Sequence, residues 1–389
     1  MDVQMMTGNL AAAWGARLAD VDYIPAFPIT PQTEIVEALA KWCEGGELAA
    51  RFVTMDSEHS MMTAAGAAEA TGARVFTATS SQGLLYAFEV LYSISGWRAP
   101  LVLVNVSRAL AAPITLESDH NDVLAARDSG FLQIHAETCQ EVLDSILMAY
   151  RIAEDERVML PVIVNLDGFS LSFTREPVSI PDAEQVRKFL PPFRPAHLGF
   201  RASVPHSLGV AVIGGTPYAY FRHQMHLAST NALEVHREVA ASFEQLFGRR
   251  YDLVERYRLD DAEDVLVMTN SCSSTGKATL AGGCHPWRIA GASGCGGVGS
   301  ESRAGAGWHS VSGNFRLAVS RSRAAAGTVL LHRRARGTES IGGRVSRDLR
   351  ANGESRSQRK RNRSGSPLHS SRASGDDSAP DGSGRDTKS

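Results

Sequence analysis

The sequence predicts an α/β protein in which a parallel β-sheet is flanked by helices, followed by a truncated second domain and a disordered tail. Before residue 170, short apolar runs rich in β-branched residues alternate with longer amphipathic segments. The short runs are apolar throughout, as expected for strands that are buried on both faces of a parallel sheet. This patterning stops near residue 280, which predicts the truncation and the tail.

The elements follow from local periodicity and from helix-start and turn residues. Helices are expected over Leu10–Ala19, Pro31–Cys43, Glu58–Ala70, Leu84–Ser95, Glu141–Ala153 and Ala228–Leu246. Strands are expected at Arg74–Thr79, Leu101–Val106, Leu132–Ala136, Val162–Leu166 and Val265–Thr269. Ligands of parallel sheets bind at the carboxyl ends of the strands. The loops that begin at Thr79, Ser107 and Asp167 are therefore the candidate site.

Charge divides the chain into two unlike parts. Residues 281–389 hold 17 Arg and 2 Lys against 8 acidic residues, whereas residues 1–280 hold 21 basic against 34 acidic residues. Residues 281–389 also contain 19 Gly and 19 Ser, a composition that cannot bury a hydrophobic core. It could be a basic arm for RNA or lipid, a solvated linker, or translation out of frame. We favour translation out of frame. One alternative reading frame of the gene after codon 280 should then encode a sequence with a regular pattern of helices and strands. Nucleic-acid binding ranks lowest because few aromatic residues are interleaved with the charges.

Cysteine content and hydropathy indicate a cytoplasmic protein. The five cysteines lie far apart, without the spacing of a metal knuckle, a cluster motif or a disulfide framework. The N-terminus lacks the basic region of a secretory signal, and no window approaches the roughly 18 apolar residues of a membrane span. We expect no membrane association and no metal bound by this chain itself.

Two helix starts contain candidate site residues, each with an ordinary alternative. In Pro28-Ile29-Thr30-Pro31, Thr30 could simply cap a helix, or its hydroxyl and the backbone donors could face an anionic ligand. Glu58 could be a first-turn acid favoured by the helix dipole, or a carboxylate held in a tight, dry cleft.

The strand ends contribute further candidates. Arg108 follows an apolar strand and has no acidic neighbour in sequence, so a substrate carboxylate could supply its partner. Asp119, His120, Asp122 and Arg127 fall within ten residues of one another. Metal binding is possible on composition, but the spacing favours a salt-bridge network at an interface.

Together these motifs resemble the 2-oxoacid:acceptor oxidoreductases, and in particular the alpha subunit of pyruvate:ferredoxin oxidoreductases. The matching segments occur in the family's order over about residues 5–280. They are Gly8-Asn9, Phe27–Glu34, Ser57–Ser60, Phe76–Leu84, Asp119–Asp122, Arg127–Gly130 and Asp167–Phe169. One departure is Phe173, which stands where the family commonly has a histidine.

The resemblance implies an enzyme whose active site is shared between chains. Thiamine diphosphate would lie between this chain and a beta subunit that supplies the diphosphate and Mg2+ site. This sequence indeed lacks a Gly-Asp-Gly motif followed by the expected Asn. Gamma and delta subunits would carry iron–sulfur clusters, coenzyme A would be co-substrate, and ferredoxin or flavodoxin would accept electrons. The chain alone should be inactive.

The resemblance also assigns roles to residues. Glu58 would contact the aminopyrimidine of the cofactor, while Thr30 and Arg108 would hold the substrate carboxylate. Further cofactor-binding positions would be Pro28, Ile29, Ser81, Gln82 and Gly83. Interface or structural roles fall to Asp119, His120, Asp122, Arg127 and Asp167.

The expected domains are a pyrimidine-binding domain at 1–190, a connecting helical segment at 191–255, the start of a transketolase C-terminal-like domain at 256–280, and the low-complexity tail at 281–389. Pyruvate is the favoured substrate, with branched-chain, aryl and 2-oxoglutarate substrates as alternatives. Leu116-Glu117-Ser118 could line the acyl pocket. Two other hypotheses remain open: a catalytically silent adaptor with a basic tail, and a different thiamine enzyme of transketolase or sulfopyruvate decarboxylase type.

Overall fold

A parallel sheet organises the structure, a computed structural model that describes residues 2–195, 198–200, 202–205, 207–260, 266–281 and 325–328. All of these residues belong to one unit within Met1–Arg334. The strand order of the sheet is β4-β5-β7-β6-β10-β9, and every neighbouring pair is parallel. The strands are β4 (Phe76–Thr79), β5 (Val102–Ser107), β6 (Leu132–His135), β7 (Val162–Asp167), β9 (Val254–Glu255) and β10 (Ala325–Thr328).

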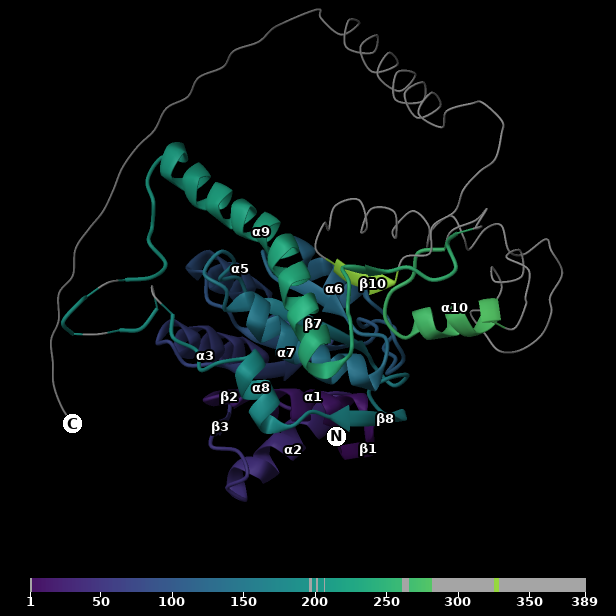
Figure 1. Ribbon diagram of the computed structural model, residues 1–389. Helices are drawn as coiled ribbons and strands as arrows, with labels where there is room; N and C mark the ends of the chain where they lie inside the picture. The colour runs from purple at the N-terminus through teal and green to yellow at the C-terminus, as the bar shows by residue number, and fades with distance from the viewer. Residues whose placement is uncertain are drawn as a thin grey trace, which may run out of the picture. The chain divides into compact units, whose positions relative to one another are not determined.

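The first four predicted strands are confirmed, and their continuous apolar character has the expected cause. Every residue of β5 and β7 is buried, because helices cover both faces of the sheet. Val102, Val104 and Val106 point into one core, which includes α1 (Gly8–Leu18), α7 (Cys139–Ala153) and the second half of α9 (Gly215–Phe247). Leu103 points into the other core, with α3 (Glu58–Ala70) and α5 (Phe88–Trp97). Figure 1 shows these helices around the sheet.

Two smaller strand pairs were not predicted. β2 (Tyr23–Ala26) and β3 (Arg51–Thr54) form a parallel pair, which a bridge between Tyr23 and Val75 connects to the start of β4. β1 (Asp2–Thr7) pairs antiparallel with β8 (Arg175–Ile180). The first four residues of β1 are exposed, so this strand lacks the apolar alternation by which sequence analysis detects strands.

The predicted helices are present at the expected places in the sequence, but the bounds of several differ from the prediction. α3 has the predicted bounds, and α1, α7 and α2 (Thr33–Glu44) differ by a few residues. The predicted helix Leu84–Ser95 divides at Ala87 into α4 (Gln82–Tyr86) and α5. α9 begins well before its predicted start at Ala228, and its added N-terminal part is exposed. The remaining helices are α6 (Asn121–Ala125), followed by a 3-10 turn at Ala126–Asp128, α8 (Ala183–Phe189) and α10 (Cys272–Ala281).

The C-terminal expectations are only partly covered by the described residues. Residues 266–269 form none of the named strands, so the strand predicted at Val265–Thr269 is wrong there, and Val265 lies outside the described residues. Four residues of the expected tail form β10 between β6 and β9. Residues 282–324 and 329–389 lie outside the described residues, and so does the prediction of disorder for them. No helix in the described part of the chain combines the length and apolar character needed to cross a bilayer.

Candidate active site

Three strand ends meet at the carboxyl edge of the sheet. Ser107 and Asp167 are register partners at the ends of β5 and β7. The Gly168 amide donates to the Ser107 carbonyl at 2.8 Å, and the Ser80 hydroxyl donates to the Val106 carbonyl at 2.7 Å. The loops after β4, β5 and β7 are therefore joined directly, as parallel topology predicts.

Arg108 lies among these loops with its side chain only partly used. Its Nε donates to the Thr30 carbonyl at 2.7 Å, and Nη1 donates to Gln82 Oε1 at 3.1 Å and to Ser81 Oγ and the Ala109 carbonyl at 3.3 Å each. Nη2 makes no hydrogen bond with any described residue, and no described carboxylate forms an ion pair with Arg108, which is 5% exposed. Burial lowers the pKa of Arg108, and the negative charge of Asp122 opposes that effect.

The turn before α2 presents Thr30 to solvent rather than using it as a cap. The helix begins at Thr33, with Gln32 as its cap residue and without a side-chain capping bond. Gln32 Nε2 donates to the Phe27 carbonyl, and Asn9 Nδ2 donates to the Pro31 carbonyl, each at 2.8 Å. The capping alternative for Thr30 is therefore wrong. Thr30 is exposed, on a turn that hydrogen bonds from Asn9 and Gln32 hold in place. Pro28 is also exposed and Ile29 is partly buried.

Glu58 occupies the first turn of α3 as a buried carboxylate. Ser57 caps the helix by accepting the Ser60 amide at 3.2 Å. Glu58 is 7% exposed, yet no donor among the described residues makes a hydrogen bond to its carboxylate. The two alternatives from the sequence were a first-turn acid favoured by the helix dipole and a carboxylate held in a cleft. The burial favours the cleft.

Gly83 forms the wall opposite Glu58. A Cβ at this position would lie 2.7 Å from Glu58 Oε1 and 2.5 Å from Thr79 Oγ1, so only glycine fits. Thr79 Oγ1 and Gln82 Nε2 are buried without a hydrogen-bond partner in the described structure. Unpaired buried polar atoms are uncommon, and their grouping here is typical of a binding site for a polar ligand. Thr79 begins one of the candidate loops predicted from the sequence, but no role was assigned to it there.

Asp122 accepts hydrogen bonds that hold the loop after β4 in place. Its Oδ1 accepts the Ser107 hydroxyl at 2.8 Å and the Val123 amide at 2.7 Å. Its Oδ2 accepts the Ser81 amide at 3.0 Å and Asn105 Nδ2 at 3.1 Å. Burial raises the pKa of Asp122, and these four hydrogen bonds counteract part of that increase.

The other members of the expected salt-bridge network have separate partners. His120 Nε2 lies 2.6 Å from Asp167 Oδ1, Asp119 Oδ1 accepts the Asn121 amide, and Arg127 pairs with Asp128 at 3.6 Å. Within the described residues these four side chains do not form one network among themselves, and the network expected at an interface stays a prediction. Burial alone would lower the pKa of His120, but the hydrogen bond and charge of Asp167 raise it overall.

Asp167 also connects the sheet to the segment before α10. Its Oδ2 accepts the Ser271 amide at 3.0 Å and also the Ser271 hydroxyl. The adjacent Asn270 Nδ2 donates to the Asn165 carbonyl at 3.1 Å. These contacts are consistent with the structural role expected of Asp167.

One cluster of carboxylates could hold a cation on geometry alone. Glu137, Glu141 and Glu255 lie close together, but the Lys277 ammonium already contacts Glu137 at 2.7 Å and also contacts Glu255. Burial raises the pKa of Glu141 to about 7. The arrangement is that of an ion-pair cluster.

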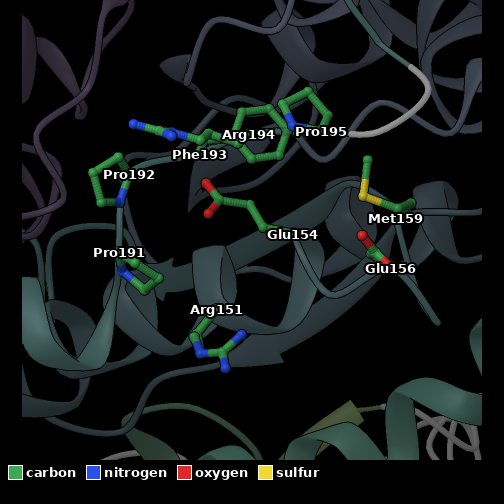
Figure 2. Close-up of a pocket in the computed structure, with 9 residues that line it drawn as sticks. All are labelled: Arg151, Glu154, Glu156, Met159, Pro191, Pro192, Phe193, Arg194 and Pro195. Atoms are coloured by element: carbon green, nitrogen blue, oxygen red, sulfur yellow. The ribbon is translucent and has the colours of Figure 1, made fainter.

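The pocket shown in Figure 2 lies away from this edge. It has a volume of about 310 Å³ and is lined by the end of α7 and the Pro191–Pro195 segment. Glu154 points toward that segment in Figure 2, and Arg74, just before β4, donates to both of its oxygens at 2.6 and 2.8 Å. Because Arg74 precedes its strand, this pocket belongs to the amino edge of the sheet.

The fold and the carboxyl-edge site define an α/β domain of the thiamine diphosphate-binding class. The profile of the pyruvate flavodoxin/ferredoxin oxidoreductase family, thiamine diphosphate-binding domain, matches residues 14–241. The chain belongs to this family.

Relatives with assigned names agree. The chain is 49% identical over 283 residues to pyruvate synthase subunit PorA of Methanocaldococcus jannaschii, covering 72% of each chain. It is 42% identical to pyruvate synthase subunit PorA of Thermotoga maritima, covering 69% of each. It is 40% identical to ketoisovalerate oxidoreductase subunit VorA of Pyrococcus horikoshii, covering 71% of this chain and 70% of the relative.

A solved structure supports the fold. 2-Oxoglutarate:ferredoxin oxidoreductase from Magnetococcus marinus, with 2-oxoglutarate, coenzyme A and succinyl-CoA bound, matches with a TM-score of 0.51 at 20% identity. The match covers 60% of this chain and 45% of that chain, so this chain spans less than half of the solved one.

Proposed function

We propose that this chain is the alpha subunit of a 2-oxoacid:ferredoxin oxidoreductase and supplies the pyrimidine side of a thiamine diphosphate site. The observation that carries the proposal is Glu58, a buried carboxylate without a described hydrogen-bond donor, facing the Gly83 wall. Membership of the thiamine diphosphate-binding family supports it.

The residues present fit the pyrimidine end of this cofactor. Glu58 offers an acceptor, Thr79 Oγ1 offers a hydroxyl, and Gln82 Nε2 offers a donor, each without a described hydrogen-bond partner. Gly83 allows Glu58 and Thr79 to lie close to the backbone, since a Cβ there would lie 2.7 Å from Glu58 Oε1 and 2.5 Å from Thr79 Oγ1. When bound, the cofactor supplies the nucleophile and electron sink for decarboxylation. Glu58 would hold a proton at the ring nitrogen it faces, which a carboxylate can do best where water is excluded. Pro28, Ile29, Ser81 and Gly83 would shape the rest of the pyrimidine pocket.

Arg108 and Thr30 would hold the substrate. Arg108 Nη2 is free of described partners, and a 2-oxoacid carboxylate is the chemical group that a guanidinium fork binds best. Its Nε contact to the Thr30 carbonyl fixes the direction of the fork, and the exposed Thr30 hydroxyl lies on the same turn. Such fixed donors orient the reacting carbonyl and stabilise developing negative charge.

The rest of the enzyme would come from partners. A beta subunit would hold the diphosphate and Mg2+, and gamma and delta subunits would carry iron–sulfur clusters that pass electrons to ferredoxin or flavodoxin. Coenzyme A would accept the acyl group. We place the complex in the cytoplasm.

Pyruvate is the proposed substrate. The most similar of the relatives cited above, at 49% and 42% identity, are pyruvate synthase subunits. A branched-chain 2-oxoacid is the second candidate, because a ketoisovalerate oxidoreductase subunit matches at 40%. A pocket separates substrates by only about 1–3 kcal/mol per methylene, so turnover has to decide between them.

The test is anaerobic co-production of this chain with the beta and small subunits encoded beside it. Reduction of viologen is then measured with coenzyme A and a panel of pyruvate, branched-chain, aryl and 2-oxoglutarate substrates, with and without thiamine diphosphate. We expect thiamine-dependent reduction with the highest kcat/KM on pyruvate. An assembled complex that reduces viologen with none of them would overturn the proposal. Product formation without acceptor reduction would indicate the other thiamine-enzyme classes instead.

A further inference from the structure

Ser81 has a backbone conformation that needs support. Its φ and ψ are 48° and −116°, and a residue with a Cβ rarely adopts positive φ. Such a conformation persists only where surrounding contacts hold it. The contact on the Ser81 amide is the 3.0 Å hydrogen bond to Asp122 Oδ2.

The turn held in this way determines the positions of two site residues. The Ser81 hydroxyl lies 2.7 Å from Gln82 Oε1 and 2.9 Å from the Ala109 carbonyl and can donate its one proton to either oxygen. Gln82 Oε1 in turn accepts Arg108 Nη1. The amide of Gly83 donates to the Ser80 carbonyl at 2.8 Å, which closes the turn beneath Glu58.

Asp122 is itself rigidly held. It is fully buried, and Ser107, Asn105 and the Val123 amide occupy its remaining acceptor positions. Asn105 and Ser107 also bind Asn165 Oδ1, at 2.9 and 2.7 Å, so the carboxylate is anchored to the ends of β5 and β7. Asp122 also faces Arg108 as a negative charge without occupying its free Nη2.

We propose that Asp122 is a positioning residue for this site: by holding the Ser81 amide, its carboxylate sets Gln82 against Arg108 and Gly83 against Glu58. The inference rests on the proposed function, since it concerns the same cofactor and substrate. It gives Asp122 a role distinct from the interface role expected from the sequence.

The test uses Asp122→Asn in the assembled complex. The amide group retains the shape, but its NH2 cannot accept a hydrogen bond and its charge is lost. We expect the Kd of thiamine diphosphate, measured by calorimetry, and the KM of the 2-oxoacid each to rise about tenfold or more. Asp128→Asn is the matched control, because Asp128 is 74% exposed and contacts only Arg127 among the described ion pairs. It should leave both constants unchanged.

Tyr150→Phe separates positioning from general stability. It removes the buried hydrogen bond from the Tyr150 hydroxyl to the Val75 carbonyl at 2.8 Å, at the amino end of β4 and away from the site. We expect a lower melting temperature with nearly unchanged Kd and KM. If Asp122→Asn behaves in the same way, lowering only the melting temperature, Asp122 is merely structural and the inference is overturned.

Amide hydrogen exchange provides a measurement that needs no variant. In the wild-type complex the Ser81 amide should exchange as slowly as the amides of β5, and exchange at the rate of an open loop would overturn the inference. The proposed function is judged separately. A wild-type complex that binds thiamine diphosphate and reduces viologen supports that function whatever the Asp122 variant does.

Discussion

Arg108 Nε lies 2.7 Å from the carbonyl oxygen of Thr30, so that the end of β5 and the turn before α2 hold one another in place. The two residues are far apart in sequence and meet because the end of β5 and the start of α2 both lie at the carboxyl edge of the sheet. The contact uses one side of the guanidinium and leaves Nη2 directed elsewhere. The arrangement is that of a carboxylate-binding fork with its orientation fixed in advance.

Arg108→Lys should therefore weaken substrate binding. A lysine ammonium is a single point of donation and cannot hold Thr30, Gln82 and a substrate carboxylate together. We expect the KM for the 2-oxoacid to rise by about tenfold to a hundredfold, with a smaller change in thiamine diphosphate affinity. Steady-state viologen reduction by the assembled complex measures this. Arg187→Lys, on the exposed face of α8, is the control. An unchanged KM would remove Arg108 from the substrate site.

Gly83→Ala tests the wall opposite Glu58. The new Cβ would lie 2.7 Å from Glu58 Oε1 and 2.5 Å from Thr79 Oγ1, which displaces both groups. We expect calorimetry to show thiamine diphosphate affinity of the complex reduced by about tenfold or more. Gly96→Ala is the matched control, because a Cβ there meets nothing within 4 Å. Equal affinities for the two variants would contradict the site geometry.

At the opposite edge, the buried Arg74–Glu154 pair should contribute to stability rather than to catalysis. Arg74 donates to both oxygens of Glu154 and also to the Ala19 and Pro191 carbonyls. Glu154→Leu would leave a buried guanidinium without its counter-charge, which typically costs about 3–5 kcal/mol. Urea unfolding of the full chain should show this loss, while the KM of the complex that still assembles stays near wild type. A loss below about 1 kcal/mol would mean that Arg74 finds another partner.

His236 should make the chain sensitive to acid. It is buried on α9, its Nδ1 has no partner among the described residues, and burial lowers its pKa to about 4. The pKa of His236 in the folded chain is below its unfolded value of about 6.5. The contribution of neutral His236 to the free energy of unfolding is therefore fully present above pH 6.5 and is lost as the pH falls toward 4. This lowering of the His236 pKa corresponds to a loss of about 3 kcal/mol in the free energy of unfolding at low pH.

The comparison with His236→Leu isolates this effect from other titrating groups. Unfolding free energy measured between pH 7 and 4 should decline less steeply in the variant. Parallel curves for the two proteins would show that His236 is protonated without cost. His135, whose pKa is also lowered to about 4 by burial and by the charge of His120, should behave similarly.

The sequence predicted those parts of the fold whose signal is local. Ser57 and Glu58 mark the start of α3, and the continuous apolar runs of β5 and β7 follow from their burial on both faces. β1 could not be predicted because its first four residues are exposed and its pairing partner, β8, is distant in sequence. The first part of α9 was also not predicted, and its large apolar residues, such as Tyr218 and Phe221, are exposed rather than packed in a core.

The site residues divide in the same way, into those that the sequence motifs identify and those that depend on contacts between distant residues. The resemblance of motifs selected Glu58, Arg108 and Gly83, which the structure brings to one edge of the sheet. Asp122 was assigned to a salt-bridge network with its sequence neighbours, but one of its four hydrogen-bond donors is the Ser81 amide, 41 residues away. Only the tertiary structure reveals which donors surround a buried carboxylate. In the same way, only the tertiary structure shows that the hydroxyl of Thr79, which the sequence placed in a candidate loop, is buried without a described partner.

The most direct test of the central claim is viologen reduction by the assembled complex containing Glu58→Gln. The amide keeps the size of the side chain but cannot hold a shared proton as a carboxylate does. Pyruvate-dependent kcat should fall by about a hundredfold or more with subunit assembly intact, while Glu37→Gln, an exposed glutamate on α2, should retain wild-type activity. Equal kcat values for Glu58→Gln and wild type would contradict the assignment of this chain to the pyrimidine side of a thiamine diphosphate site.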